Sequence, residues 1–187
     1  DGALLTGIRH SLTLAAGAAV IGLLVGFAVA YILTYSQFKL KRLIDMLTLV
    51  AMAVPGVVLG IGYIFVWNQK WLQPLGLNLY GKPSILVLAS VASAVPLINR
   101  VLVGGMSKVP QELLTASQVQ GARLGRRLKT ILLPLLHSSM VSAVLAAFGG
   151  SVFNLAITTI LYPPNYSTLP VYISDSYNDV NFGYAAA

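Results

Sequence analysis

The stretch that decides the fold is ELLTASQVQGARLGRRLKTILLP, from Glu112 to Pro134. It is a polar, arginine-rich island in a chain in which 57% of the residues are hydrophobic and only 9% are charged. Soluble domains carry about 25% charged residues. Most of this chain therefore cannot face water.

Long apolar runs flank the island. They cover about 11–33, 44–67, 84–103 and 134–161. Each is close to the ~20 residues that a helix needs to cross ~30 Å of hydrocarbon. Length alone would suggest one ordinary domain, but these runs predict an all-α polytopic membrane protein, with a single transmembrane domain over 1–187.

Both ends of the chain have the appearance of cuts in a longer sequence. It starts at Asp1 rather than at a methionine, and it stops at Ala187 just after an apolar restart. We expect a piece of a longer polypeptide, with a further helix cut off at the C-terminus.

Lysine and arginine counts predict the orientation. The loop after the first run and the loop 106–133 together carry eight basic residues, against three on the opposite side. Since basic residues accumulate in cytoplasmic loops, we expect 106–133 in the cytoplasm and 162–182 outside. The same rule accounts for the net charge of +7 without nucleic-acid binding, for which no basic stripe with exposed aromatics exists.

Several residues interrupt the apolar runs. Asp45 follows Arg42 by three residues, a spacing that allows a helical ion pair. Arg100 is close enough to the end of its run to extend toward lipid headgroups. Pro55 kinks the second run, either as a packing bend or as a bend beside a pathway. Trp67, Trp71 and Tyr80 fit an interfacial aromatic belt.

The island itself predicts two short helices. Pro110 can occupy a first helical position, Glu112 lies in the first turn, where the helix dipole favours an anion, and Gly121 is a natural stop. About ten residues are too few to span a membrane. A second helix, Arg123 to Ile131, carries arginines at helical spacing, for which headgroup anchoring is favoured over contact with a protein.

Here a resemblance becomes specific. The order Thr115-Ala116-Ser117, three residues, Gly121, nine residues, Ile131-Leu132-Leu133-Pro134 resembles the pattern Glu-Ala-Ala, Gly, Ile-x-Leu-Pro of permease subunits of binding-protein-dependent ABC importers. Thr115 replaces the usual Glu, and Ser117 replaces the second Ala. Glu112, one helical turn earlier, is the candidate substitute for the missing acid.

The resemblance implies a permease core with four complete transmembrane helices and a cytoplasmic coupling helix that docks on an ATPase. It assigns the coupling role to these residues: Pro110, Glu112, Leu113, Thr115, Ala116, Ser117, Gly121, Ile131 and Pro134. The implied partners are cytoplasmic ABC ATPase subunits, a second permease subunit or half, an extracytoplasmic solute-binding protein and lipid. ATP and Mg are expected on the partner ATPase, with no cofactor or metal in this chain, and the location is the bacterial inner membrane.

Within that family the chain is most similar to the ferric-iron group, with 2-aminoethylphosphonate and polyamine permeases as alternatives. Leu79-Tyr80-Gly81 and the segment 160–171 carry this likeness. Iron-type permeases place a Glu-Leu pair in the fourth span, where this chain has Asn154-Leu155, so the acid expected on a cation path is missing.

Four polar residues inside spans are candidates for the translocation path: Ser93, Asn99, Asn154 and Thr158. Polar residues in spans face a bundle or a cavity, although hydrogen bonding between helices would also explain them. No phosphate-binding Gly-x4-Gly-Lys-Ser/Thr loop and no His-Glu-x-x-His motif occur in the sequence. The chain therefore lacks the usual motifs for ATP hydrolysis and for metalloprotease chemistry, and we do not expect it to be an enzyme. A passive channel or a membrane anchor subunit is the alternative from a different class.

Overall fold

The computed structural model describes residues 2–72, 74, 76, 79–164 and 166–178, and all regular structure in these residues is helical. The helices are α1 (Gly2–Tyr35), α2 (Lys41–Ala53), α3 (Gly56–Trp67), α4 (Pro83–Met106), α5 (Gln111–Val119), α6 (Leu124–Arg127), α7 (Leu133–Val152), α8 (Leu155–Leu161) and α9 (Leu169–Asn178). A 3-10 turn, Lys70–Leu72, follows α3, and a π-helical turn, Leu128–Leu132, joins α6 to α7. The predicted all-α architecture is confirmed.

Small residues let the three longest helices pack closely. A Cβ placed on Gly26 of α1 would lie 2.7 Å from Ile98 Cγ2 of α4, so only glycine allows this approach. Gly105 of α4 meets Ser139 of α7 in the same way, with 2.8 Å to its Cβ. Without water to drive apolar association, such close backbone packing is a main source of helix association in lipid.

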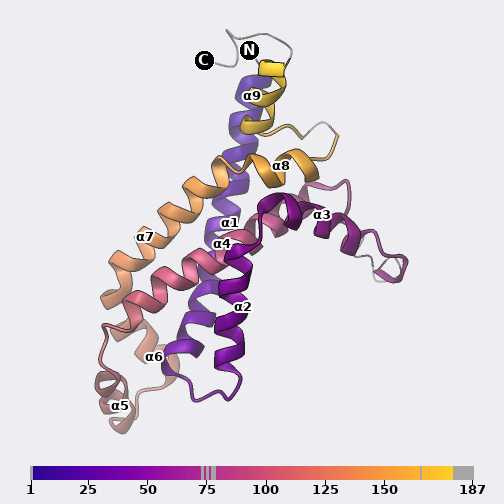
Figure 1. Cartoon of the computed structure of the whole chain (residues 1–187). Helices are drawn as coiled ribbons and strands as arrows, with labels where there is room; N and C mark the ends of the chain where they lie inside the picture. Colours follow the sequence, from indigo (N-terminus) through magenta and orange to yellow (C-terminus); the bar gives the residue numbers. More distant parts are fainter. Residues whose placement is uncertain (1, 73, 75, 77–78, 165, 179–187) are drawn as a thin grey trace.

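Two buried clusters follow from this packing. The larger joins α1, α4 and α7 to the island, and it includes Ala30, Ile98, Leu102, Met106, Leu114, Leu132 and Leu136. The smaller lies at the other end of α1 and α4 and joins them to α8. It includes Leu14 of α1, Ile85 and Leu86 of α4, and Ile157 and Leu161 of α8. Figure 1 shows α4 packed with α1 and α7, and α8 and α9 at the end opposite α5.

The first helix is longer than the predicted run 11–33 and includes Arg9 and His10. Tertiary contacts explain the extension. The His10 ring stacks on Tyr166, with 3.9 Å between centroids, and its Nδ1 lies 2.9 Å from the Ser167 carbonyl oxygen. The Ser11 hydroxyl accepts a hydrogen bond from the Leu169 N–H at 2.8 Å. These contacts hold the segment before α9 against α1.

The predicted second run, 44–67, is broken rather than kinked. The helix α2 ends at Ala53, Val54 is extended with ψ 122°, and α3 starts at Gly56. Proline removes a backbone donor and disfavours helical geometry in the residue before it, and α3 leaves α2 at 109°. By length and composition, α1, α4 and the stretch Leu124–Val152 could each cross a membrane, or four segments if the bent pair counts as one.

The predicted fourth run, 134–161, also divides. Its helical stretch already begins at Leu124, and α7 ends at Val152. The Asn154 Oδ1 accepts a hydrogen bond from the Ile157 N–H at 3.2 Å and so caps a new helix, α8. Because the side chain offers this N-terminal partner, the chain turns within a stretch whose hydrophobicity is continuous.

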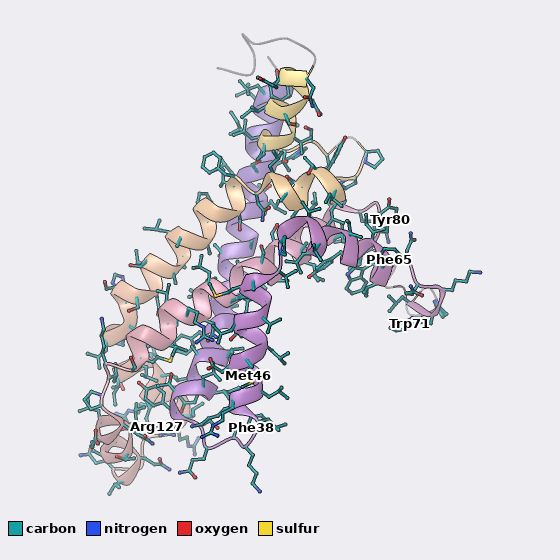
Figure 2. All side chains as sticks on the ribbon, viewed as in Figure 1. Phe38, Met46, Phe65, Trp71, Tyr80 and Arg127 are labelled. Carbon is teal, nitrogen blue, oxygen red and sulfur yellow. The ribbon has the colours of Figure 1, made fainter. Side chains whose placement is uncertain are left out.

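The two ends of the bundle differ in chemistry. The loop between α1 and α2 lies at the same end as α5 and α6 (Figure 1), so the two most basic segments are together, as the charge count requires. Figure 2 shows Phe65, Trp71 and Tyr80 around the far end of α3, and Trp71 and Tyr80 are exposed, as expected of interfacial aromatics. Which end is cytoplasmic stays a prediction. Residues 165 and 179–182 of the predicted outer segment lie outside the described residues, as does the apolar restart before Ala187.

Candidate functional site

The candidate coupling helix, α5, starts directly after the end of α4. The Val109 N–H donates to the Met106 carbonyl at 3.0 Å, which turns the chain, and the Tyr35 hydroxyl donates to the same carbonyl at 2.8 Å. Pro110 occupies the cap position, with ψ 133°, and α5 begins at Gln111, one residue later than the predicted start. The end of α4 is thus tied to the end of α1 where α5 departs.

Only one side of α5 is anchored. Leu114 is 5% exposed and packs in the larger cluster with Met106 and Leu132. By contrast, Leu113 is 47% exposed and Val119 is 89% exposed. Leu114 is the one buried residue of this nine-residue helix, and its outer side exposes an apolar valine. Because an isolated helix this short is unstable in water, α5 has the form of a docking element.

The other predicted α5 residues lie on or beside this open surface. Glu112, Thr115 and Ala116 are exposed, and Ser117 is half-buried. The Thr115 hydroxyl donates to the carbonyls of Gln111 at 3.3 Å and Glu112 at 3.0 Å. It therefore bonds within its own helix, whereas the Glu112 carboxylate in the first turn is the acidic group that α5 presents.

Gly121 ends α5 in the conformation that its sequence position predicts. Its φ is +81°, in the left-handed region. The Gly121 N–H donates to the Gln118 carbonyl at 2.9 Å, and the Ala122 N–H donates to the Ser117 carbonyl at 3.0 Å. This pair of bonds is a Schellman motif, so the chain reverses sharply after α5 and returns toward α7.

The return segment differs from the predicted helix Arg123–Ile131. It consists of the single turn α6 and the π-helical turn, which leads into α7. Pro134 lies in the first turn of α7 and has no N–H to donate to the preceding turn, which agrees with the wider winding before it. Ile131 packs on the larger cluster. The Arg127 Nη1 donates to the Gln118 Oε1 at 3.3 Å, so one of the island's arginines holds α5 instead of facing only headgroups.

The four candidate path residues do not line one common hollow. Ser93 and Asn154 line one hollow of about 360 Å³, beside Gly56 at the start of α3. Thr158 is 1% exposed, and its hydroxyl donates to the Asn154 carbonyl at 2.6 Å. Asn99 is fully buried and faces α2. The structure thus brings two of the four to a hollow at the break between α2 and α3.

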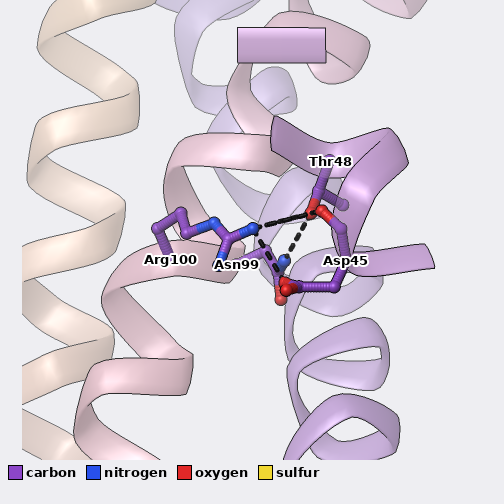
Figure 3. A network of polar contacts seen from close by, with 4 residues as sticks. All are labelled: Asp45, Thr48, Asn99 and Arg100. Carbon is purple, nitrogen blue, oxygen red and sulfur yellow. Dashed lines mark hydrogen bonds and ion pairs between the residues drawn. The ribbon is translucent and has the colours of Figure 1, made fainter. Parts of the chain in front are cut away.

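A polar cluster between α2 and α4 was not predicted. Asp45 pairs with Arg100, with 2.8 Å between Oδ1 and Nη2, rather than with Arg42. The same Nη2 donates to the Thr48 hydroxyl at 3.3 Å, and Asn99 Nδ2 donates to it at 3.4 Å (Figure 3). Arg100 therefore points at α2, where its Nη2 is held by Asp45 and Thr48. Charges in spans usually pair, and that rule was the available signal.

Comparison with known proteins agrees with this geometry. Residues 4–187 match the protein family described as binding-protein-dependent transport system inner membrane component. The ferric transport system permease protein FbpB of Actinobacillus pleuropneumoniae is 26% identical over 171 residues, which are 91% of this chain and 24% of the relative. PhnV of Salmonella paratyphi A, named for a 2-aminoethylphosphonate transport system, is 28% identical over 172 residues, 92% of this chain and 63% of the relative. The chain thus spans only part of either relative.

The fold also has a solved counterpart. An inward-facing structure of the MetNI methionine ABC transporter superposes with a TM-score of 0.67, covering 98% of this chain and 82% of that chain. The sequences are 18% identical, so this likeness concerns the fold.

Proposed function

Because the chain belongs to the family of binding-protein-dependent transport system inner membrane components, we propose that it is a transmembrane permease subunit of an ATP-driven importer rather than an enzyme. In this role α1, α4 and α7 form the membrane scaffold, and α5 transmits the movement of a cytoplasmic ATPase to it.

The observation that carries the proposal is the build of α5. Its anchored side joins the cluster that contains the ends of α1, α4 and α7, and its open side presents Glu112, Leu113, Thr115 and Val119. A partner that moves α5 would therefore act on three long helices through Leu114. Such a ligand-driven change requires different binding energies in two states, which ATP and Mg bound by the partner ATPase would supply.

Copurification tests this assignment. The full-length protein, tagged and extracted from its native membrane, is expected to bring down an ABC ATPase that carries a phosphate-binding loop. Replacing Val119 with aspartate should abolish the interaction, because it places a charge on the most exposed apolar residue of α5. Ser107→Asp, a charge added at an exposed position just before α5, is the matched control. Recovery of no ATPase with the wild-type protein would refute the proposal.

For the solute we propose ferric iron. The similarity to FbpB over 91% of the chain supports iron, and the similarity to PhnV over 92% of the chain supports 2-aminoethylphosphonate as the second candidate. The importer, reconstituted with its ATPase and solute-binding protein, should accumulate radiolabelled ferric iron in an ATP-dependent manner. Uptake of 2-aminoethylphosphonate without uptake of ferric iron would identify the phosphonate as the solute instead.

The hollow at the α2–α3 break is our candidate for part of the translocation path. In a cysteine-free chain, a cysteine at Asn154 should react with a water-soluble thiol reagent, and its labelling rate should change when ATP is bound. A cysteine at Thr158, which is buried beside it, should stay protected. Protection of position 154 in every state would remove this hollow from the path.

A further inference from the structure

A trough runs between α1, α2 and α4, and its two parts differ in chemistry. At the end near the α1–α2 loop is a hollow of about 220 Å³ lined by Leu33, Lys41, Arg42, Asp45, Arg100 and Val103. Further along the same three helices is an apolar groove of about 420 Å³, whose lining includes Val25, Val29, Ile44, Leu47, Ala92 and Val95. Neither part contains a residue assigned above to coupling.

The two parts continue one another. On α1 the lining residues Val25, Val29 and Leu33 follow at four-residue spacing, which places them along one side of a helix. On α4, Arg100 and Val103 follow Pro96 of the groove lining by four and seven residues, again along one side. From Leu88 to Val103 the trough extends along α4 for about 22 Å at 1.5 Å per residue.

The charged end has a net positive charge. Asp45 and Arg100 neutralise each other through their 2.8 Å ion pair, which leaves Lys41 and Arg42. Lys41 is half-buried, with Nζ 3.3 Å from the Ser36 carbonyl, and Arg42 is exposed. Both lie in the first turn of α2, which has no side-chain cap, so the positive end of the helix dipole adds to the attraction for an anion.

The polar cluster of Figure 3 stands where the two parts meet. Arg100 lines the charged hollow and Thr48 lines the groove, and the Arg100 Nη2 joins them at 3.3 Å. Because Asp45 and Thr48 of α2 hold this nitrogen, the Arg100 side chain has a fixed position on one side of the charged hollow. The trough therefore presents a preformed cationic end followed by an apolar length.

We propose that this trough binds one anionic phospholipid. Its phosphate lies at Lys41 and Arg42, and one acyl chain lies along the apolar groove. The dimensions agree, because half of a ~30 Å hydrocarbon core is ~15 Å and the headgroup takes the rest of the trough. Basic pockets between transmembrane helices are suited to anionic headgroups. A soluble anion would contact only the charged hollow and would leave the apolar groove empty. The proposal needs the membrane location but not the transport role.

Native mass spectrometry of the full-length protein in detergent tests the proposal, with phosphatidylglycerol and phosphatidylcholine of identical acyl chains as probes. The wild type should bind one phosphatidylglycerol in preference. The double variant Lys41→Gln/Arg42→Gln should bind it roughly 30-fold more weakly, at about 1 kcal/mol for each charge near the surface. The control Lys39→Gln/Lys108→Gln removes two charges at the same end, outside the lining, and should change binding less than about twofold.

Two further arms separate a lipid site from other occupants. Ala92→Trp fills the groove and should abolish binding, whereas Leu24→Trp, at an exposed position of α1 outside the lining, should not. Inorganic phosphate should fail to compete. Equal losses in both charge variants, displacement by inorganic phosphate, or unchanged binding in Ala92→Trp would each overturn the proposal, as would a second protein chain cross-linked to a cysteine at position 92. Each variant is first checked for wild-type elution in size-exclusion chromatography.

Discussion

Replacing Gly121 with valine is expected to uncouple transport from ATP hydrolysis while leaving membrane insertion intact. Gly121 has a φ of +81°, where a residue with a Cβ is strained by about 1–2 kcal/mol and a β-branched one most of all. The Schellman bonds to Ser117 and Gln118 would be lost, so α5 would leave its docking position. Uptake by proteoliposomes should fall by roughly tenfold, which corresponds to 1.4 kcal/mol, while the assembled ATPase continues to hydrolyse ATP.

Two variants control this result. Gly125→Val adds the same side chain at a helical glycine with open space around it, and it should leave uptake near the wild-type value. Gly121→Asn should retain part of the transport, because asparagine tolerates the left-handed conformation better than valine does. Wild-type uptake by Gly121→Val would count against α5 as the coupling element, and so would equal losses in Gly121→Val and Gly125→Val.

Removing Arg100 is expected to destabilise the attachment of α2. All residues of α2 are described and none is buried, so its position depends strongly on the cluster with Arg100 and Asn99. Arg100→Leu leaves the Asp45 carboxylate without its partner. Breaking a fully buried pair costs ~3–5 kcal/mol, but these side chains are 28% and 42% exposed, so about 1–2 kcal/mol is expected after allowance for solvent screening.

A double-mutant cycle measures this contribution. The free energy of unfolding in detergent is compared for the wild type, Arg100→Leu, Asp45→Leu and the double variant. The double variant should be more stable than the two single losses together predict, because no lone charge remains. Arg126→Leu, at an exposed arginine of α6, serves as the control and should shift stability by less than ~0.5 kcal/mol. Additive losses would show that Asp45 and Arg100 do not depend on each other.

Local chemistry predicted some features of the site closely. Gly121 ends α5 because glycine adopts the left-handed conformation at little cost, and this is a property of the residue itself. The existence of α5 followed from Pro110 and Glu112 at one end and Gly121 at the other. The apolar runs predicted membrane-spanning helices, since hydrophobicity over about 20 residues is also a local property.

Other features depended on contacts between distant residues. Asn154 was expected inside one continuous span, but its Oδ1 accepts a hydrogen bond from the Ile157 N–H and caps α8. Arg42 was the nearer partner for Asp45 along the chain, but the packing of α2 against α4 selects Arg100 instead. Arg127 was expected mainly at headgroups, yet the reversal at Gly121 brings Gln118 within 3.3 Å of it.

By itself, then, the sequence determined that this chain lies in a membrane, that its elements are helices, and that a short polar helix ending at Gly121 stands between two spans. These follow from the solvent preference and backbone freedom of residues taken a few at a time. Only the tertiary structure decided where α2 breaks from α3, which charge neutralises Asp45, and how three helices enclose a trough with a cationic end. Those outcomes depend on which side chains approach from other helices, and no local pattern contains that information.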